Sequence, residues 1–207
     1  MTISDYHNKH LGRTDEETER RIFVKELELK KILSETRFRP GFENIRVAVL
    51  GCADKRFVQL HKSIFEKLLH KPVELITFDI TTEHLEGEDR VIQHDVTTPL
   101  PGAPYDITFG HVLLKLIQTE KQWGVITNAL DALRTPGLGI FVYDLEDITT
   151  KDPIQKDGYF SVPLDEYKQK LIHKHIKFRD IRWDISLDEM PIPIRGLNGG
   201  ALVLEKI

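Results

Sequence analysis

The segment that most constrains this chain is Arg46–Lys55, in which an apolar run enters a glycine turn and a helix-like segment follows. A second apolar run, Val73–Phe78, stops at the acid Asp79. This pattern is typical of buried strands that deliver their backbone to a ligand at their carboxyl ends, with the acid placed to hold two ribose hydroxyls. It predicts parallel strands and a site for an adenosine-containing cofactor.

Apolar periodicity extends this pattern along the chain. Strands are expected at Arg46–Leu50, Val73–Phe78, Arg90–Asp95, Tyr105–Phe109, Leu138–Tyr143, Ile176–Ile185 and Ala201–Lys206, and helices at Thr14–Leu33, Arg56–Leu69, from Thr119, and at Asp165–His175. Alternating strands and helices predict a doubly wound α/β fold with a mostly parallel, seven-stranded sheet covered on both faces. No helix separates the last two strands, so an antiparallel terminal hairpin is expected.

Two helix starts have capping-box spacing, namely Thr14 with Glu17 and Thr119 with Gln122. In the helix that begins at Thr119, the residues expected to be buried are Trp123, Ile126, Leu130 and Leu133. The segment Thr135–Gly137 is expected to end this helix. The domain prediction is an N-terminal helical extension over residues 1–40 and one α/β domain over 41–207.

Composition limits the cellular context and the partners. The 207 residues include one cysteine, which cannot form an internal disulfide and therefore fits a reducing compartment. We find neither a signal-peptide pattern nor an apolar run of about 20 residues, so a cytoplasmic protein without membrane contact is expected. A net charge of −4 gives no general attraction for polyanions such as nucleic acid.

With these residues in view, the chain resembles the class I S-adenosylmethionine-dependent methyltransferases. Val47–Phe57 is similar to that family's first motif, a glycine-rich strand–turn–helix, and Thr77–Ile80 to its second, acid-terminated motif. Tyr105–Leu113 resembles the fourth motif, where a strand end opens beside the transferable methyl group. The resemblance implies a Rossmann-like fold over residues 40–207, S-adenosylmethionine as cofactor and methyl transfer as the reaction.

The resemblance also implies roles for particular residues. Those expected to bind the cofactor are Gly51, Cys52, Ala53, Asp79, Ile80, Asp95, Val96 and Gly110. His111 follows the fourth strand, and a neutral imidazole there can act as a general base, although alignment of the acceptor can suffice without one. Three of these residues also have a plainer interpretation: Asp79 as a solvated strand-end acid, Asp95 as a turn-starting acid and His111 as a surface or helix-capping histidine.

The first motif departs from the family pattern. Three spaced glycines are usual, whereas this chain has Gly51, Ala53 and Lys55, and Val49 replaces the acid that commonly begins the motif. Glycine serves there for positive φ and for close approach of the ligand to the backbone. A weakened, a rearranged and a lost pocket are all compatible with these changes. The alternative to an enzyme is therefore a non-catalytic binding or partner module with the same fold.

A nicotinamide-dependent oxidoreductase is a further alternative. A dinucleotide needs several glycines and a bare helix N-terminus for its pyrophosphate. Asp54 is expected to lie at that corner and to repel the diphosphate, which favours the methyl donor because it carries no phosphate.

The acceptor is poorly specified by the sequence. No Asn-Pro-Pro-Tyr or Asp-Pro-Pro-Tyr follows the fourth strand, which argues against methylation of adenine in DNA, and the resemblance slightly favours a small molecule. Oxygen, nitrogen and carbon all remain open as the acceptor atom. The apolar loop Met190–Gly196 is a further candidate for contact with the acceptor. His173 and His175 lie two apart on a predicted helix, so no metal site is expected there.

Overall fold

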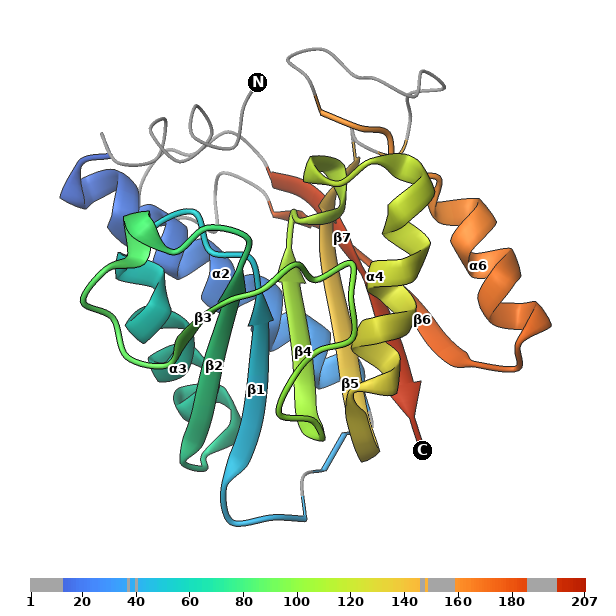
Figure 1. Ribbon diagram of the computed structural model, residues 1–207, viewed down its shortest axis with the longest axis horizontal. Helices are drawn as coiled ribbons and strands as arrows, with labels where there is room; N and C mark the ends of the chain where they lie inside the picture. The colour runs from blue at the N-terminus through green and yellow to red at the C-terminus, as the bar shows by residue number, and fades with distance from the viewer. Residues whose placement is uncertain (1–12, 37, 40, 146–147, 149–158, 186–196) are drawn as a thin grey trace.

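A computed structural model describes residues 13–36, 38–39, 41–145, 148, 159–185 and 197–207 (Figure 1). Its sheet contains the strands β1 (Ile45–Leu50), β2 (Val73–Asp79), β3 (Val91–Gln93), β4 (Tyr105–His111), β5 (Leu133–Asp144), β6 (Lys177–Ile185) and β7 (Leu197–Lys206). The strand order is β3-β2-β1-β4-β5-β7-β6. β1 to β5 run parallel, and β7 lies antiparallel between β5 and β6. The predicted doubly wound sheet and its antiparallel hairpin are confirmed.

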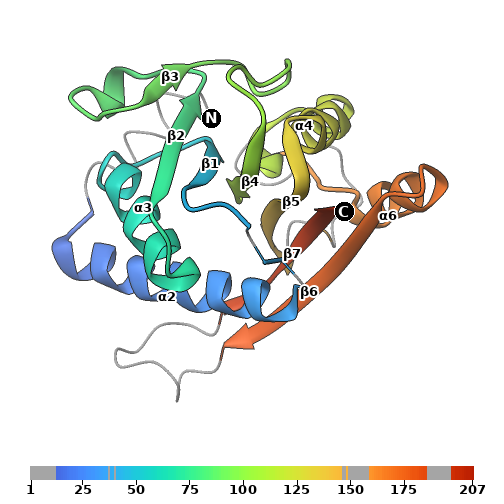
Figure 2. The same ribbon diagram turned by 90° about the horizontal axis from the view of Figure 1, so that it is seen from below.

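Helices cover both faces of this sheet (Figure 2). On one face lie α2 (Asp15–Glu35) and α3 (Arg56–Leu69), and on the other α4 (Thr119–Asp131) and α6 (Leu164–His173). Two short 3-10 helices, η1 (Glu83–Leu85) and η2 (Leu114–Leu116), follow β2 and β4. Each face has its own apolar core, and strand side chains alternate between the two cores, as the pleat requires.

Helix α2 begins at the predicted capping box. The Thr14 hydroxyl accepts the Glu17 N–H at 3.2 Å, and the Glu17 carboxylate accepts the Thr14 N–H at 3.0 Å. The helix packs Leu29 and Ile32 into the core beside α3. The same buried face carries the ionisable residues Lys25 and Glu28, which its apolar periodicity alone does not explain.

The second predicted capping box is wrong. α4 starts at Thr119 with Gln118 as its N-cap, and no side chain caps it. Gln122 is instead fully buried, where its amide N–H donates to Ile117 O and Ser161 O and its Oε1 accepts the Tyr167 hydroxyl. The demands of this buried side-chain network override the local capping pattern.

The end of α4 also differs from the prediction. The helix stops at Asp131, and β5 begins at Leu133, before the Thr135–Gly137 segment that was expected to end the helix. The buried stripe is Gln122, Val125, Ile126 and Ala129, so of the four predicted positions only Ile126 is a buried residue of this helix. The loop Met190–Gly196 lies outside the described residues.

Candidate functional site

A cavity of about 490 Å³ opens at the carboxyl ends of the strands, next to the turn after β1 and the end of β4. The strand order reverses between β1 and β4, which is where ligands bind in open α/β sheets. Predicted site residues that line the cavity are Gly51, Cys52, Ala53, Asp79, Ile80, Asp95, Val96 and His111. Gly110 does not line it: this residue is buried in β4, where an added Cβ would lie 3.2 Å from a Phe141 ring atom.

The turn after β1 explains which glycine of the first motif the fold requires. Gly51 has φ +79°, and an added Cβ would lie 3.1 Å from Leu113 Cδ1, so a side chain there meets both strain and crowding. Lys55 has φ −56° and ψ −30°, which any residue adopts. Its side chain is exposed and is not part of the cavity lining. The substitution at position 55 therefore leaves the cavity unblocked.

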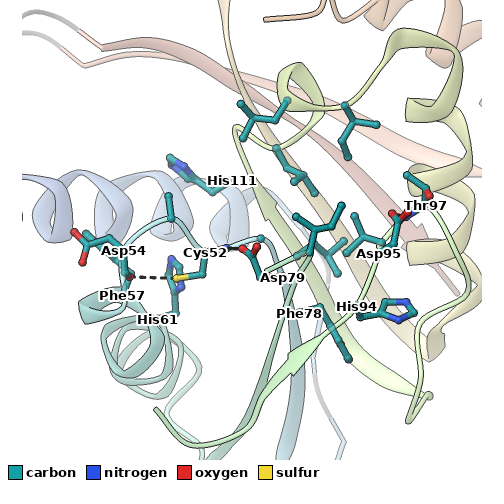
Figure 3. A pocket seen from close by; sticks show the side chains of 18 of the residues that line it. Cys52, Asp54, Phe57, His61, Phe78, Asp79, His94, Asp95, Thr97 and His111 are labelled. Atoms are coloured by element: carbon teal, nitrogen blue, oxygen red, sulfur yellow. Dashed lines mark hydrogen bonds between the residues drawn. The ribbon is translucent and has the colours of Figure 1, made fainter. Parts of the chain in front are cut away.

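The buried carboxylate of Asp79 is fixed by main-chain donors on either side of it. Its Oδ2 accepts the Cys52 N–H at 2.8 Å, and its Oδ1 accepts the Thr81 N–H at 3.2 Å. A carboxylate oxygen has two lone pairs, so each retains capacity for a hydroxyl donor from a ligand. Figure 3 shows this carboxylate beside Cys52, facing the cavity.

Asp54 does not provide the repulsive corner expected from the sequence. Its carboxylate accepts from Arg56 Nε at 3.0 Å and from the Arg56 terminal nitrogen at 2.8 Å, and Arg13 lies 3.8 Å away. Burial works to raise the pKa of this carboxyl, but hydrogen bonds from Arg56 outweigh it and the pKa falls below its usual range. Because these cations compensate the charge, the argument against a diphosphate ligand was wrong.

Cys52 is a packed residue. It is buried, its thiol donates to the main-chain oxygen of Asp54 at 3.3 Å, and burial raises its pKa to about 12. A thiol in that state is no nucleophile at neutral pH.

The β3 side of the cavity combines apolar and acidic groups. Ile80, which is 46% exposed, and the buried Val96 both line the cavity. The Asp95 carboxylate accepts the Thr97 N–H at 2.9 Å, which is the main reason its pKa is lowered. Asp95 is thus a turn-starting acid and also a cavity residue. We call these residues, together with those of the turn after β1, the β2 end of the cavity; they are Gly51, Cys52, Ala53, Asp79, Ile80, Asp95 and Val96.

His111, at the end of β4, is held by an acid from α2. Its Nε2 lies 2.9 Å from Glu28 Oε2, and Figure 3 shows the ring directed toward that helix. Burial and the nearby Lys25 charge lower the pKa of His111 below 6.5, against the opposing effect of Glu28. The ring is therefore neutral at pH 7. With Nε2–H donating to Glu28, Nδ1 keeps a free lone pair.

Two further groups complete this side of the cavity, and sequence reasoning missed both. Lys25 is 9% exposed, and its ammonium lies 5.2 Å from the Phe57 ring centroid and 5.9 Å from that of Phe109. His61, 3% exposed, packs between the same two rings. We call Lys25, Glu28, His61 and His111 the α2 end of the cavity. The signal in the sequence that could have revealed this end of the cavity is the pair Lys25 and Glu28, which lies on the buried, mainly apolar face of α2.

Within the described residues, no group of three or more histidine, cysteine or acidic side chains is arranged to hold a metal ion. In the same ranges, no helix combines the length and apolarity needed to cross a bilayer.

The sequence matches no protein-family model and no curated protein. Solved structures do resemble the chain. The N-methyltransferase NodS from Bradyrhizobium japonicum, in complex with S-adenosyl-L-homocysteine, superposes with a TM-score of 0.57 at 12% identity over 100% of this chain and 99% of that chain. The plantazolicin methyltransferase BpumL, also bound to S-adenosylhomocysteine, gives 0.60 at 14% identity over 99% and 88%.

Other matches are longer proteins. TehB from Haemophilus influenzae gives a TM-score of 0.54 at 14% identity, covering 89% of this chain and 62% of that chain. The chain likewise spans 59% of a matched Listeria monocytogenes protein. At such identities the likeness establishes architecture rather than activity. The chain has the fold of the class I S-adenosylmethionine-dependent methyltransferases.

Proposed function

We propose that this protein transfers the methyl group of S-adenosylmethionine to a small-molecule acceptor. The observation that carries the proposal is the Asp79 carboxylate, fixed by main-chain donors and facing a cavity beside the positive-φ turn at Gly51. This is a suitable partner for the two hydroxyls of a ribose. BpumL is named as a plantazolicin methyltransferase and NodS as an N-methyltransferase, and both names support methyl transfer as the reaction class.

The residues of the β2 end fit the nucleoside part of this donor. Asp79 would hold the ribose, Ile80 and Val96 would face the adenine, and the Asp95 carboxylate would accept from its amino group. Cys52 and Ala53 would border the donor along the turn. When bound, S-adenosylmethionine supplies an electrophilic methyl carbon, whose bond to sulfur breaks with its electron pair as the bond to the acceptor forms.

His111 is the candidate general base. Its neutral ring, fixed through Nε2 by Glu28, presents Nδ1 as the proton acceptor. A protonated acceptor group would give its proton to Nδ1 as it attacks, and Glu28 would stabilise the imidazolium that results. Glu28 acts through His111 and is thus a positioning residue. For an acceptor that is already ionised, alignment in the cavity is the main contribution.

Calorimetry with S-adenosylhomocysteine tests the proposal. We expect saturable binding and a thermal shift, with no competition from a nicotinamide dinucleotide. No heat and no thermal shift at millimolar ligand would favour a non-catalytic module with this fold. Binding of the dinucleotide instead would favour an oxidoreductase, a result that the Asp54–Arg56 pair does not exclude.

A further inference from the structure

The α2 end of the cavity contains a cation without an anionic partner. Lys25 forms no ion pair with any other residue in the described part of the chain, although Glu28, one helical turn away, is near enough to raise its pKa. Burial outweighs that effect and lowers the pKa of Lys25 to about 8. At neutral pH the side chain still carries its charge, inside the protein, on the wall of the cavity.

His61 supplies an unused hydrogen-bonding group at the same place. Neither of its ring nitrogens has a hydrogen-bond partner among the described residues, although the side chain is buried and lines the cavity. Burial and the nearby charge of Lys25 lower its pKa well below 6.5, so the ring is a neutral donor and acceptor. A buried polar side chain without a partner is destabilising, which favours a role in binding over one in packing.

The nearby acids do not satisfy these two groups. Glu28 is bonded to His111, Asp54 to Arg56, and Asp79 to main-chain N–H groups. Asp95 lies across the cavity beside Thr97, away from His61 (Figure 3). None of these carboxylates lies within ion-pair distance of Lys25, although Glu28 balances its charge within the α2 end.

We propose that the acceptor is an oxygen acid, that is a carboxylate or an acidic phenol or enol, and that Lys25 and the His61 N–H bind its anionic oxygen. This inference rests on the proposed methyl transfer and narrows its substrate class. A protonated amine would meet the like charge of Lys25, which disfavours amines as acceptors. The position beside His111 places the bound acid next to the candidate base.

A carboxylate is also present at the amino-acid end of the donor, so the experiment must separate the two sources. The first measurement compares S-adenosylhomocysteine with 5′-methylthioadenosine, which lacks the amino-acid group, in the wild type and in Lys25→Met. For each ligand, we expect the affinity of Lys25→Met to agree with that of the wild type within about threefold. A loss of tenfold or more for S-adenosylhomocysteine alone would assign Lys25 to the donor and overturn the inference.

The second measurement uses benzoate, benzamide and benzylamine as probes of protein saturated with S-adenosylhomocysteine. We expect benzoate to bind at least tenfold more tightly than the other two, and this preference to disappear in Lys25→Met. His61→Phe should weaken benzoate binding while leaving benzamide unchanged. Lys30→Met, on an exposed position of the same helix, is the matched control and should bind like the wild type.

The outcomes separate this inference from the proposed function. If S-adenosylhomocysteine fails to bind the wild type, the proposed function itself fails. If it binds but benzoate shows no preference over benzamide and benzylamine, or binds Lys25→Met equally well, only the oxygen-acid inference is overturned. Thermal melts of both variants verify that they are folded.

Discussion

At the β2 end of the cavity, main-chain N–H groups fix the carboxylate of Asp79. At the α2 end, side chains from three separate elements lie close together. Asp79 is held by its neighbours Cys52 and Thr81 across two adjacent strand ends. Lys25, His61 and His111 come from α2, α3 and β4 and depend on how a helix docks. The β2 end therefore follows from strand pairing, and the α2 end from tertiary packing.

Under the proposed function, the two ends of the cavity would have separate tasks. A main-chain cradle suits a ligand that is always the same, since its geometry is independent of most side chains. Partly paired titratable side chains suit a ligand whose protonation state must be controlled. If this division is correct, substitutions at one end should leave binding at the other unchanged.

The largest expected effect is on catalysis. His111→Gln should lower kcat for an acceptor that binds with its proton, such as a neutral phenol or enol, by about 10²–10⁴-fold, because it removes the proton acceptor. It should change kcat little for an acceptor that binds as an anion, and should have little effect on the affinity for S-adenosylhomocysteine. Single-turnover kinetics and calorimetry would measure the two quantities. His173→Gln, on the exposed end of α6, is the matched control. An unchanged kcat would mean that alignment alone drives the reaction.

Removal of the acid at the β2 end should act on the donor instead. Asp79→Ala should weaken binding of S-adenosylhomocysteine by about 1–3 kcal/mol, because the ribose loses its acceptor. Asp89→Ala, an exposed acid outside this cavity, serves as the control in the same titration. Unchanged affinity would remove Asp79 from the site, and an equal loss of benzoate binding would contradict the division between the two ends.

The turn at Gly51 should be sensitive to any side chain. Gly51→Ala should destabilise the protein by about 1–3 kcal/mol, since alanine at φ +79° is strained and its Cβ crowds Leu113. Gly124→Ala lies within α4 with nothing in contact range, and should instead stabilise it by about 0.5–1 kcal/mol. Urea unfolding measures both. Equal stabilities would show that the turn relaxes easily.

The smallest expected effect is the pH dependence of stability due to His61. Its folded-state pKa is lowered, so between that value and 6.5 the unfolded chain binds a proton that the folded chain does not. The contribution of His61 to the free energy of unfolding is therefore retained above pH 6.5 and decreases as the pH falls below that value. Between pH 6.5 and 5.5 the loss is about 1 kcal/mol. His61→Phe should remove it, as urea unfolding at both pH values would show, while a wild-type slope in the variant would assign the effect to other groups such as His111.

Much of the architecture follows from local patterns. The predicted bounds of α3, Arg56–Leu69, match the structure, because an apolar stripe and a proline after it define that helix. The strand ends that carry Gly51 and Asp79 were found in the same way. The failure at Thr119 and Gln122 has a physical reason: Gln122 is used by Ser161 and Tyr167, which lie about 40 residues further along the chain.

The α2 end could not be predicted in this way. Lys25 and Phe109 are far apart in the sequence, and nothing local states that they meet. The acid behind His111 comes from the same helix. The departures at Ala53 and Lys55 suggested a pocket that could be weakened or lost. In the structure only Gly51 of the first motif has a backbone conformation that requires glycine.

One consequence concerns how such a protein can diverge. Helix α2 precedes the first strand, and its 21 residues contribute both the unpaired ammonium and the carboxylate behind the imidazole. If the proposed function is correct, mutation within this single segment can alter which compounds are modified, while selection on the strand termini preserves use of a common methyl source. Homologues that share the sheet but differ in this helix are expected to differ in acceptor preference.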